Sequence, residues 1–149
     1  MEIKVILNHK PVTLVGEKDE FLADILRNHG RLSIRKGCNT ACCGLCTVWL
    51  DGKPTLSCNI LGIRAAGKEI TTIEGIAQEA EEFAQVLVAE GAEQCGFCSP
   101  GFIMTVVAMK KELENPNEAD IIHYLTGNLC RCTGYMGQLR AVKTYLGVK

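Results

Sequence analysis

Thiols are the side chains whose number and spacing could do chemistry in this chain, and five of its nine cysteines lie in the first half. Cys38, Cys43, Cys46 and Cys58 form the pattern C-x4-C-x2-C-x11-C. Thiolates bind metals, and C-x4-C-x2-C with a distant fourth cysteine is the plant-type spacing for a 2Fe-2S cluster. Structural zinc also takes four cysteines, but the x4 gap fits zinc ribbons less well than paired C-x2-C knuckles. The spacing therefore favours a 2Fe-2S cluster at this quartet.

Four further cysteines form two close pairs in the second half of the chain. The pairs are Cys95-x2-Cys98 and Cys130-x-Cys132, and each precedes a segment with helical periodicity. Helix N-termini favour negative charge, so two helices directed at one thiolate-bound cluster would stabilise it. Spacing alone leaves a second iron-sulfur cluster and structural zinc open here. The ninth cysteine, Cys42, is interpreted as an ordinary loop residue beside the first quartet.

The composition excludes several other classes of protein. Disulfide bonds explain the cysteines poorly, because their number is odd and no secretory signal is recognisable. With 16 Lys and Arg against 17 Asp and Glu, the chain lacks the basic excess of proteins that bind nucleic acid or anionic membranes. The apolar run 102–109 is far shorter than the roughly 20 residues of a membrane span. We expect a cytoplasmic protein with neither kind of partner.

The first half is predicted to form a small mixed sheet with one helix. Strand-like patterns occupy residues 3–7, 12–14, 47–50, 53–57 and 69–73. Asn8-His9 and Asp51-Gly52 are the expected hairpin turns, and the second hairpin explains how the fourth cysteine of the quartet returns to its loop. A helix is predicted between the hairpins, with Asp19 as its N-cap.

The second half changes to helical periodicity, and four helices are expected there. Ser99-Pro100 is predicted to be the N-cap and first turn of the second helix, whose apolar stripe includes Phe102 and Val106. Residues 117–120 resemble a capping box for the third helix. The fold class is therefore α+β, with one domain over residues 1–75 and a helical domain over residues 76–149.

Motifs for catalysis are missing from the sequence. No G-x-G-x-x-G follows a strand and no Walker loop occurs, so a nucleotide site has no support. No acid-base pair or activated nucleophile stands out. Trp49 is interpreted as a packing residue, and the basic run 27–36 as a solvated face. The chain is therefore predicted to carry electrons for chemistry performed elsewhere.

Longer segments around the cysteines resemble a known family. They are GCNTACCGLCTVWLDGK (37–53), LSC (56–58), QCGFCSPGFIM (94–104) and LTGNLCRCTGY (125–135). Together they resemble the small iron-sulfur subunit of the molybdenum hydroxylases, the family of xanthine dehydrogenase, aldehyde oxidoreductase and nicotinate dehydrogenase, over nearly the whole chain. QCGFC-x-PG combined with NLCRCTGY is far more specific than either cysteine spacing, so the resemblance favours iron-sulfur at the second quartet too. Ala41 stands where that family commonly has glycine, so a positive φ there would be strained.

The resemblance implies an N-terminal plant-ferredoxin-like (β-grasp) domain followed by a C-terminal four-helix domain, each with one 2Fe-2S cluster. The implied ligands are Cys38, Cys43, Cys46 and Cys58 for the first cluster, and Cys95, Cys98, Cys130 and Cys132 for the second. It also implies that Gln94 and Cys132 approach a molybdopterin cofactor on a large partner subunit, and that the first cluster faces FAD on a medium subunit. Electrons would then run from molybdenum through the second cluster and the first cluster to FAD.

The implied reaction of the assembly is hydroxylation of a heterocycle or an aldehyde with oxygen derived from water. A purine such as xanthine is the favoured substrate, and nicotinate-like heterocycles come next. One alternative function is a free-standing ferredoxin-like electron carrier. Gln94 argues against this alternative, because the resemblance places it beside a molybdopterin on a partner subunit. Another is a zinc-stabilised interaction module without redox activity.

Overall fold

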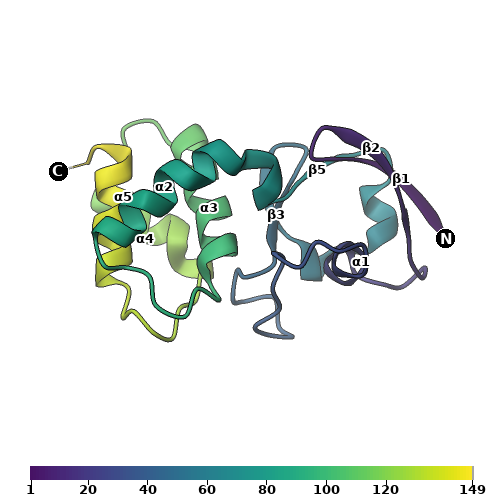
Figure 1. Ribbon diagram of the computed structural model, residues 1–149, viewed down its shortest axis with the longest axis horizontal. Helices are drawn as coiled ribbons and strands as arrows, with labels where there is room; N and C mark the ends of the chain where they lie inside the picture. The colour runs from purple at the N-terminus through teal and green to yellow at the C-terminus, as the bar shows by residue number, and fades with distance from the viewer. Residues whose placement is uncertain (149) are drawn as a thin grey trace.

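The computed structural model describes residues 1–148, and it arranges them as two units side by side along the long axis of the molecule (Figure 1). The strands and the first helix form the N-terminal unit, and the later helices form the other. No helix in the described part of the chain is long and apolar enough to cross a membrane.

The N-terminal unit is built on a five-stranded mixed sheet in the order β2-β1-β5-β3-β4. The strands are β1 (Glu2–Leu7), β2 (Lys10–Val15), β3 (Thr47–Leu50), β4 (Lys53–Leu56) and β5 (Glu69–Thr71). The two antiparallel hairpins confirm the predicted pairs, and all four turn residues have positive φ, as the favoured two-residue turns require. β5 lies between the hairpins, parallel to β1 and antiparallel to β3, and joins them into one sheet.

Helix α1 (Leu22–Asn28) buries its apolar face against this sheet. Its N-cap is Phe21, which makes no side-chain capping bond, so the prediction of Asp19 as N-cap is wrong. The helix begins later because Phe21 forms an isolated bridge with Leu61, which holds Phe21 in extended backbone. Tertiary pairing therefore sets this helix start instead of the local capping signal.

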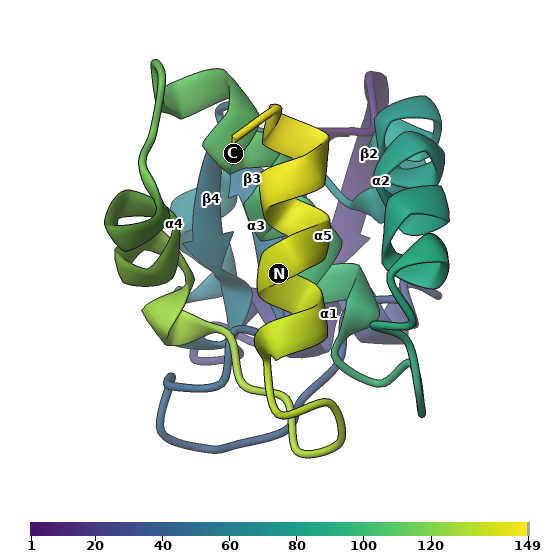
Figure 2. The same ribbon diagram turned by 90° about the vertical axis from the view of Figure 1, so that its left-hand side faces the viewer.

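The C-terminal unit contains the four predicted helices, α2 (Ala77–Ala89), α3 (Ser99–Glu112), α4 (Glu118–Tyr124) and α5 (Met136–Leu146). Figure 2 shows α5 in front, with α2 and α4 on either side and α3 behind it. The capping box of α4 is confirmed: Asn117 accepts from the Asp120 backbone N–H, and the Asp120 carboxylate accepts from the Asn117 N–H.

Helix α3 is the central element, and it is more deeply buried than its predicted single stripe implied. Every residue from Gly101 to Met109 is buried, because α3 packs against α2 on one side and against β3 on the other. Ser99 is the first helical residue and Cys98 is the N-cap, so the prediction of Ser99 as N-cap is wrong. The Ser99 hydroxyl instead donates to the Glu93 carboxylate.

The packing of α3 on β3 joins the two units. Trp49 of β3 belongs to the apolar core of the helical unit, and its Nε1 donates a hydrogen bond of 3.0 Å to the Met104 carbonyl. Lys111 lies over the indole ring, 4.4 Å from its centroid. Trp49 is thus a packing residue, as predicted, and it fixes the helical unit against the sheet.

Candidate iron-sulfur centres

The loop over residues 37–46 and the turn after β4 bring together the thiols of the first predicted quartet. The register of β3 and β4 pairs Thr47 with Leu56, which places the residues just beyond this pair side by side. The buried Ser57 fastens the junction, because its backbone N–H and its hydroxyl both donate to the Cys46 carbonyl. Cys58 follows in a short 3-10 turn over Ser57–Asn59. The hairpin therefore returns the fourth cysteine to the loop, as the spacing predicted.

The four thiols of the first quartet interact with one another. The pKa of Cys58 is raised to about 12, first by burial and then by the neighbouring Cys46 thiol, with smaller effects from Cys38 and Cys43. Backbone N–H groups of Thr40 and Cys42 lower the pKa of Cys38 to about 6, which favours its thiolate. Burial raises the pKa of Cys43. Thiols so close together lose their protons jointly only when a cation compensates the charge.

Ala41 adopts the left-handed conformation, with φ of 55°, so the strain anticipated from the sequence is present. The left-handed region costs an L-residue with a Cβ roughly 1–2 kcal/mol. We therefore expect Ala41→Gly to raise the free energy of unfolding by about 1 kcal/mol, part of the gain being offset by the entropy of glycine in the unfolded chain. Denaturant unfolding of the cluster-loaded protein measures this effect, and an unchanged or lower stability would show that the strain is relieved elsewhere.

Two loops of the helical unit bring together the thiols of the second quartet, one before α3 and one before α5. The Cys95 and Cys132 sulfurs are 3.5 Å apart. Burial raises the pKa of Cys98 to about 11, with the Cys130 thiol as the next cause. Burial also opposes ionisation of Cys130, but the Thr133 hydroxyl and backbone N–H outweigh it and lower the Cys130 pKa. The quartet therefore consists of an outer pair, Cys95 and Cys132, and an inner pair, Cys98 and Cys130.

The space at the second quartet is large enough for an inorganic cluster. A cavity of about 440 Å³ is lined by all four of its cysteines. The thiols of this quartet approach one another in pairs, Cys95 with Cys132 and Cys98 with Cys130. Two bridged irons, each bound by two thiolates, require pairs of this kind.

The two quartets adjoin where the units meet. The backbone N–H of Leu129, next to Cys130, donates a 2.9 Å hydrogen bond to the Cys43 carbonyl. Two glycines permit this approach: an added Cβ on Gly44 would lie 2.3 Å from the Gly127 oxygen, and one on Gly101 would lie 2.4 Å from the Gly44 oxygen. The cysteine-bearing loops lie on the same lower side of the molecule in Figures 1 and 2.

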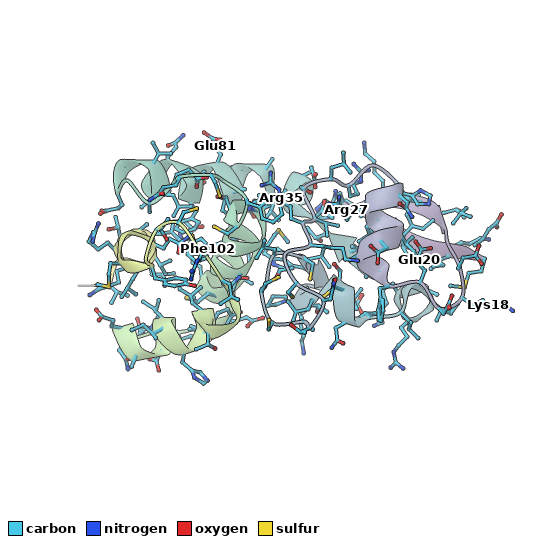
Figure 3. All side chains as sticks on the ribbon, turned by 90° about the horizontal axis from the view of Figure 1, so that it is seen from below. Lys18, Glu20, Arg27, Arg35, Glu81 and Phe102 are labelled. Atoms are coloured by element: carbon cyan, nitrogen blue, oxygen red, sulfur yellow. The ribbon has the colours of Figure 1, made fainter. Side chains whose placement is uncertain are left out.

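Three residues beside the second quartet carry contacts that the sequence did not identify. Arg35 lies at the junction of the units (Figure 3), where its Nη1 donates to the Gly96 carbonyl at 2.8 Å, so this part of the basic run is not a free solvated face. The Thr133 hydroxyl donates to Cys130 Sγ at 3.2 Å, and the Gln138 amide donates to Cys98 Sγ at 3.7 Å. Gln138 is a polar residue within a segment that was predicted from its helical periodicity, so only tertiary packing identifies its contact with Cys98.

The remaining predicted residues lie at the surface. Cys42 is exposed, and its sulfur is 3.1 Å from the Thr40 hydroxyl. Gln94 is exposed directly before Cys95 of the outer pair. Cys132 is exposed as well, so both residues expected to approach a molybdopterin lie on the outer side of the second quartet.

Comparison with known proteins matches both units to 2Fe-2S proteins. Residues 5–69 match the family described as 2Fe-2S iron-sulfur cluster binding domain, and residues 72–143 match the family described as [2Fe-2S] binding domain. The chain therefore carries two 2Fe-2S-binding domains.

Similar proteins cover nearly the whole chain. The xanthine dehydrogenase iron-sulfur-binding subunit of Escherichia coli O157:H7 is 43% identical over 137 residues, which is 89% of this chain and 86% of that protein. The nicotinate dehydrogenase small FeS subunit of Eubacterium barkeri is 37% identical over 144 residues, covering 95% and 92%. Among solved structures, a chain of quinoline 2-oxidoreductase from Pseudomonas putida 86 superposes with a TM-score of 0.90 at 34% identity, covering 98% of this chain and 92% of that one. The chain thus belongs to the family of small 2Fe-2S subunits of the molybdenum hydroxylases, oxidoreductases in which this subunit transfers electrons and is not catalytic alone.

Proposed function

We propose that this chain conducts electrons from a molybdopterin-binding large subunit to an FAD-binding medium subunit through two 2Fe-2S clusters. The observation that carries the proposal is the contact of the two cysteine quartets through the Leu129 N–H and the Cys43 carbonyl. The proposed ligands are Cys38, Cys43, Cys46 and Cys58 for the first cluster, and Cys95, Cys98, Cys130 and Cys132 for the second.

The pairing of the thiols supports this assignment. Cys38 interacts with Cys43 and Cys46 with Cys58, and in the second quartet Cys95 lies against Cys132. Each cluster, when bound, is a one-electron carrier. The thiols hold it, and the backbone N–H groups that face Cys38 stabilise negative charge on that sulfur.

The burial of the thiols supports a direction of transfer through the chain. The outer pair of the second quartet is exposed beside Gln94, which suits contact with a molybdopterin cofactor on the large subunit. The inner pair lies in one packed layer with Cys43. At the far side, Cys38 and Cys58 line an open cavity of about 410 Å³, which suits an approaching FAD subunit.

The contact between the quartets is closely packed on its inner side. A gap lined by Cys43, Cys98 and Cys130 is too small to hold a water molecule, and on their outer side the same thiols line the open cavity of about 440 Å³. The Leu129–Cys43 hydrogen bond therefore links a residue adjoining one ligand to the backbone of another ligand without a solvent gap.

The names of the relatives support a proposal for the substrate class. Xanthine dehydrogenase and nicotinate dehydrogenase subunits are both among them, so we propose a purine such as xanthine, or a related N-heterocycle, as the substrate hydroxylated by the large subunit. We also propose a cytoplasmic location, because none of the nine cysteines forms a disulfide bond in the described part of the chain, and a reducing compartment favours free thiols.

We propose that the boundary between the two domains lies between residues 75 and 76. Ile76 packs in the core of the helical unit and α2 begins at Ala77, whereas Ile70 packs in the core of the sheet unit. Ile73 also contacts the helical core, so the junction is packed instead of forming a free linker.

Anaerobic isolation of the chain from its native cells tests the proposed function. We expect about four irons and four sulfides per chain, with molybdenum and FAD in co-purifying subunits. The same iron without molybdenum, FAD or partners would contradict the proposal in favour of a free electron carrier. Zinc without sulfide would overturn the redox function altogether. Turnover of the intact particle with xanthine and with nicotinate then distinguishes the two substrate classes.

A further inference from the structure

Gln138 is a buried polar side chain that faces a cysteine sulfur. It lies in the first turn of α5 with 4% of its surface exposed, and its Nε2 donates to Cys98 Sγ at 3.7 Å. We propose that Gln138 is a positioning residue of the second 2Fe-2S cluster: its amide stabilises the charge on Cys98 Sγ and raises the reduction potential of that cluster. This inference rests on the proposed role of Cys98 as a ligand.

The chemistry of the amide fixes its orientation toward the sulfur. A thiolate accepts hydrogen bonds and repels a carbonyl oxygen, so the NH₂ end of Gln138 faces Cys98. Gln138 borders the tight gap that also contains Cys43, Cys98 and Cys130. No water fits in that gap and Gln138 is buried, so this hydrogen bond is shielded from solvent and is stronger than one in water.

Reduction explains why this hydrogen bond matters for electron transfer. A cluster that accepts one electron gains one negative charge, and part of that charge is carried by the cysteine sulfurs. A donor to a ligating sulfur therefore stabilises the reduced form more than the oxidised form and raises the potential. Cys98 belongs to the inner pair, so the effect falls on the side of the cluster that faces Cys43 and the first cluster.

The substitution Gln138→Met tests the proposal, because methionine keeps the length and the buried packing but has no donor. Redox titration of the complete complex, followed by EPR, measures both clusters in one sample. We expect the midpoint potential of the second cluster to fall, with a change of up to about tenfold in the ratio of reduced to oxidised cluster at a fixed potential, which is about 59 mV for a one-electron couple. The first cluster is the internal control and keeps its potential.

A matched control is Thr105→Val. Thr105 is also a buried polar residue of the helical unit, but its hydroxyl donates to the Gly101 carbonyl and accepts from the Asn128 amide, and neither partner is a thiol. We expect no change of either potential in T105V. Equal shifts in Q138M and T105V, or equal shifts of both clusters in Q138M, would show a general packing effect and overturn the assignment.

A second variant keeps the test decisive if Q138M assembles its cluster poorly. Gln138→Glu retains the shape and places a carboxylate at the sulfur, so the potential must fall further than in Q138M. An unchanged potential in either variant refutes the role of Gln138. Should both variants lose the second cluster, pulsed EPR of the Gln94→Ala variant, which keeps Gln138, labelled with side-chain ¹⁵N-glutamine must show a nitrogen coupling to the second cluster, and its absence refutes the role. Lack of iron and sulfide in the wild-type chain itself would instead mean that the proposed function has failed.

Discussion

Replacing Cys43 with serine is expected to remove the EPR signal of the first cluster and to leave the signal of the second. Cys43 is buried, its thiol interacts with Cys38, and its carbonyl accepts a hydrogen bond from Leu129. These contacts fix its position, so we expect no other thiol to replace it. The iron content should fall from about four to about two per chain. Loss of a whole ligand exceeds the roughly 10–100-fold cost of a second-shell change, so electron delivery to the acceptor should drop more than about 100-fold.

Cys42→Ser is the matched control for this experiment. Cys42 is the neighbouring thiol in the chain, but its side chain is exposed and contacts Thr40. We expect C42S to retain both signals and full iron content, and Cys42 to be unable to replace Cys43 in C43S. A first-cluster signal that survives in C43S with unchanged g-values would contradict the ligand assignment on this loop.

Gly44→Ala is expected to separate the two units and to slow electron transfer between the clusters. Gly44 has φ of 75°, and a Cβ there would lie 2.3 Å from the Gly127 oxygen and 2.7 Å from the Asn128 amide nitrogen. Relief of that clash requires moving backbone that holds the Leu129–Cys43 hydrogen bond. Left-handed strain and overpacking together should lower the free energy of unfolding by about 2–5 kcal/mol.

Gly67→Ala is the control that separates the effect of backbone strain from the effect of the steric clash at Gly44. Gly67 has nearly the same φ, 74°, but an added Cβ would have no heavy atom within 4 Å. We expect G67A to lose only about 1–2 kcal/mol and to keep the wild-type rate of intercluster transfer. Denaturant unfolding and rapid-freeze EPR after reduction measure the two quantities. Equal results for G44A and G67A would mean that the close approach at Gly44 does not control the contact between the clusters.

Local signals predicted most of the helices and strands, and also which cysteines form two groups. The hairpin turns at Asn8-His9 and Asp51-Gly52 were predictable because few residues adopt positive φ readily. The capping box at Asn117 was predictable because its hydrogen bonds join residues three apart. Local capping signals did not predict where α1 and α3 begin. Helix α1 begins after Phe21, which is bridged to Leu61, and not after Asp19. Helix α3 has Cys98 as its N-cap, and not Ser99.

The sequence by itself determined which thiols could form two quartets, because the type of each residue and its spacing from the next are properties of the sequence. Only the tertiary structure decided which thiols are inner and outer, that Gln138 reaches Cys98, and that the quartets meet through Leu129 and Cys43. These contacts join residues 40 to 86 positions apart, and no local pattern encodes them. They arise because α3 is buried between β3 and α2, and because Gly44 and Gly101 let the backbones of the two units touch.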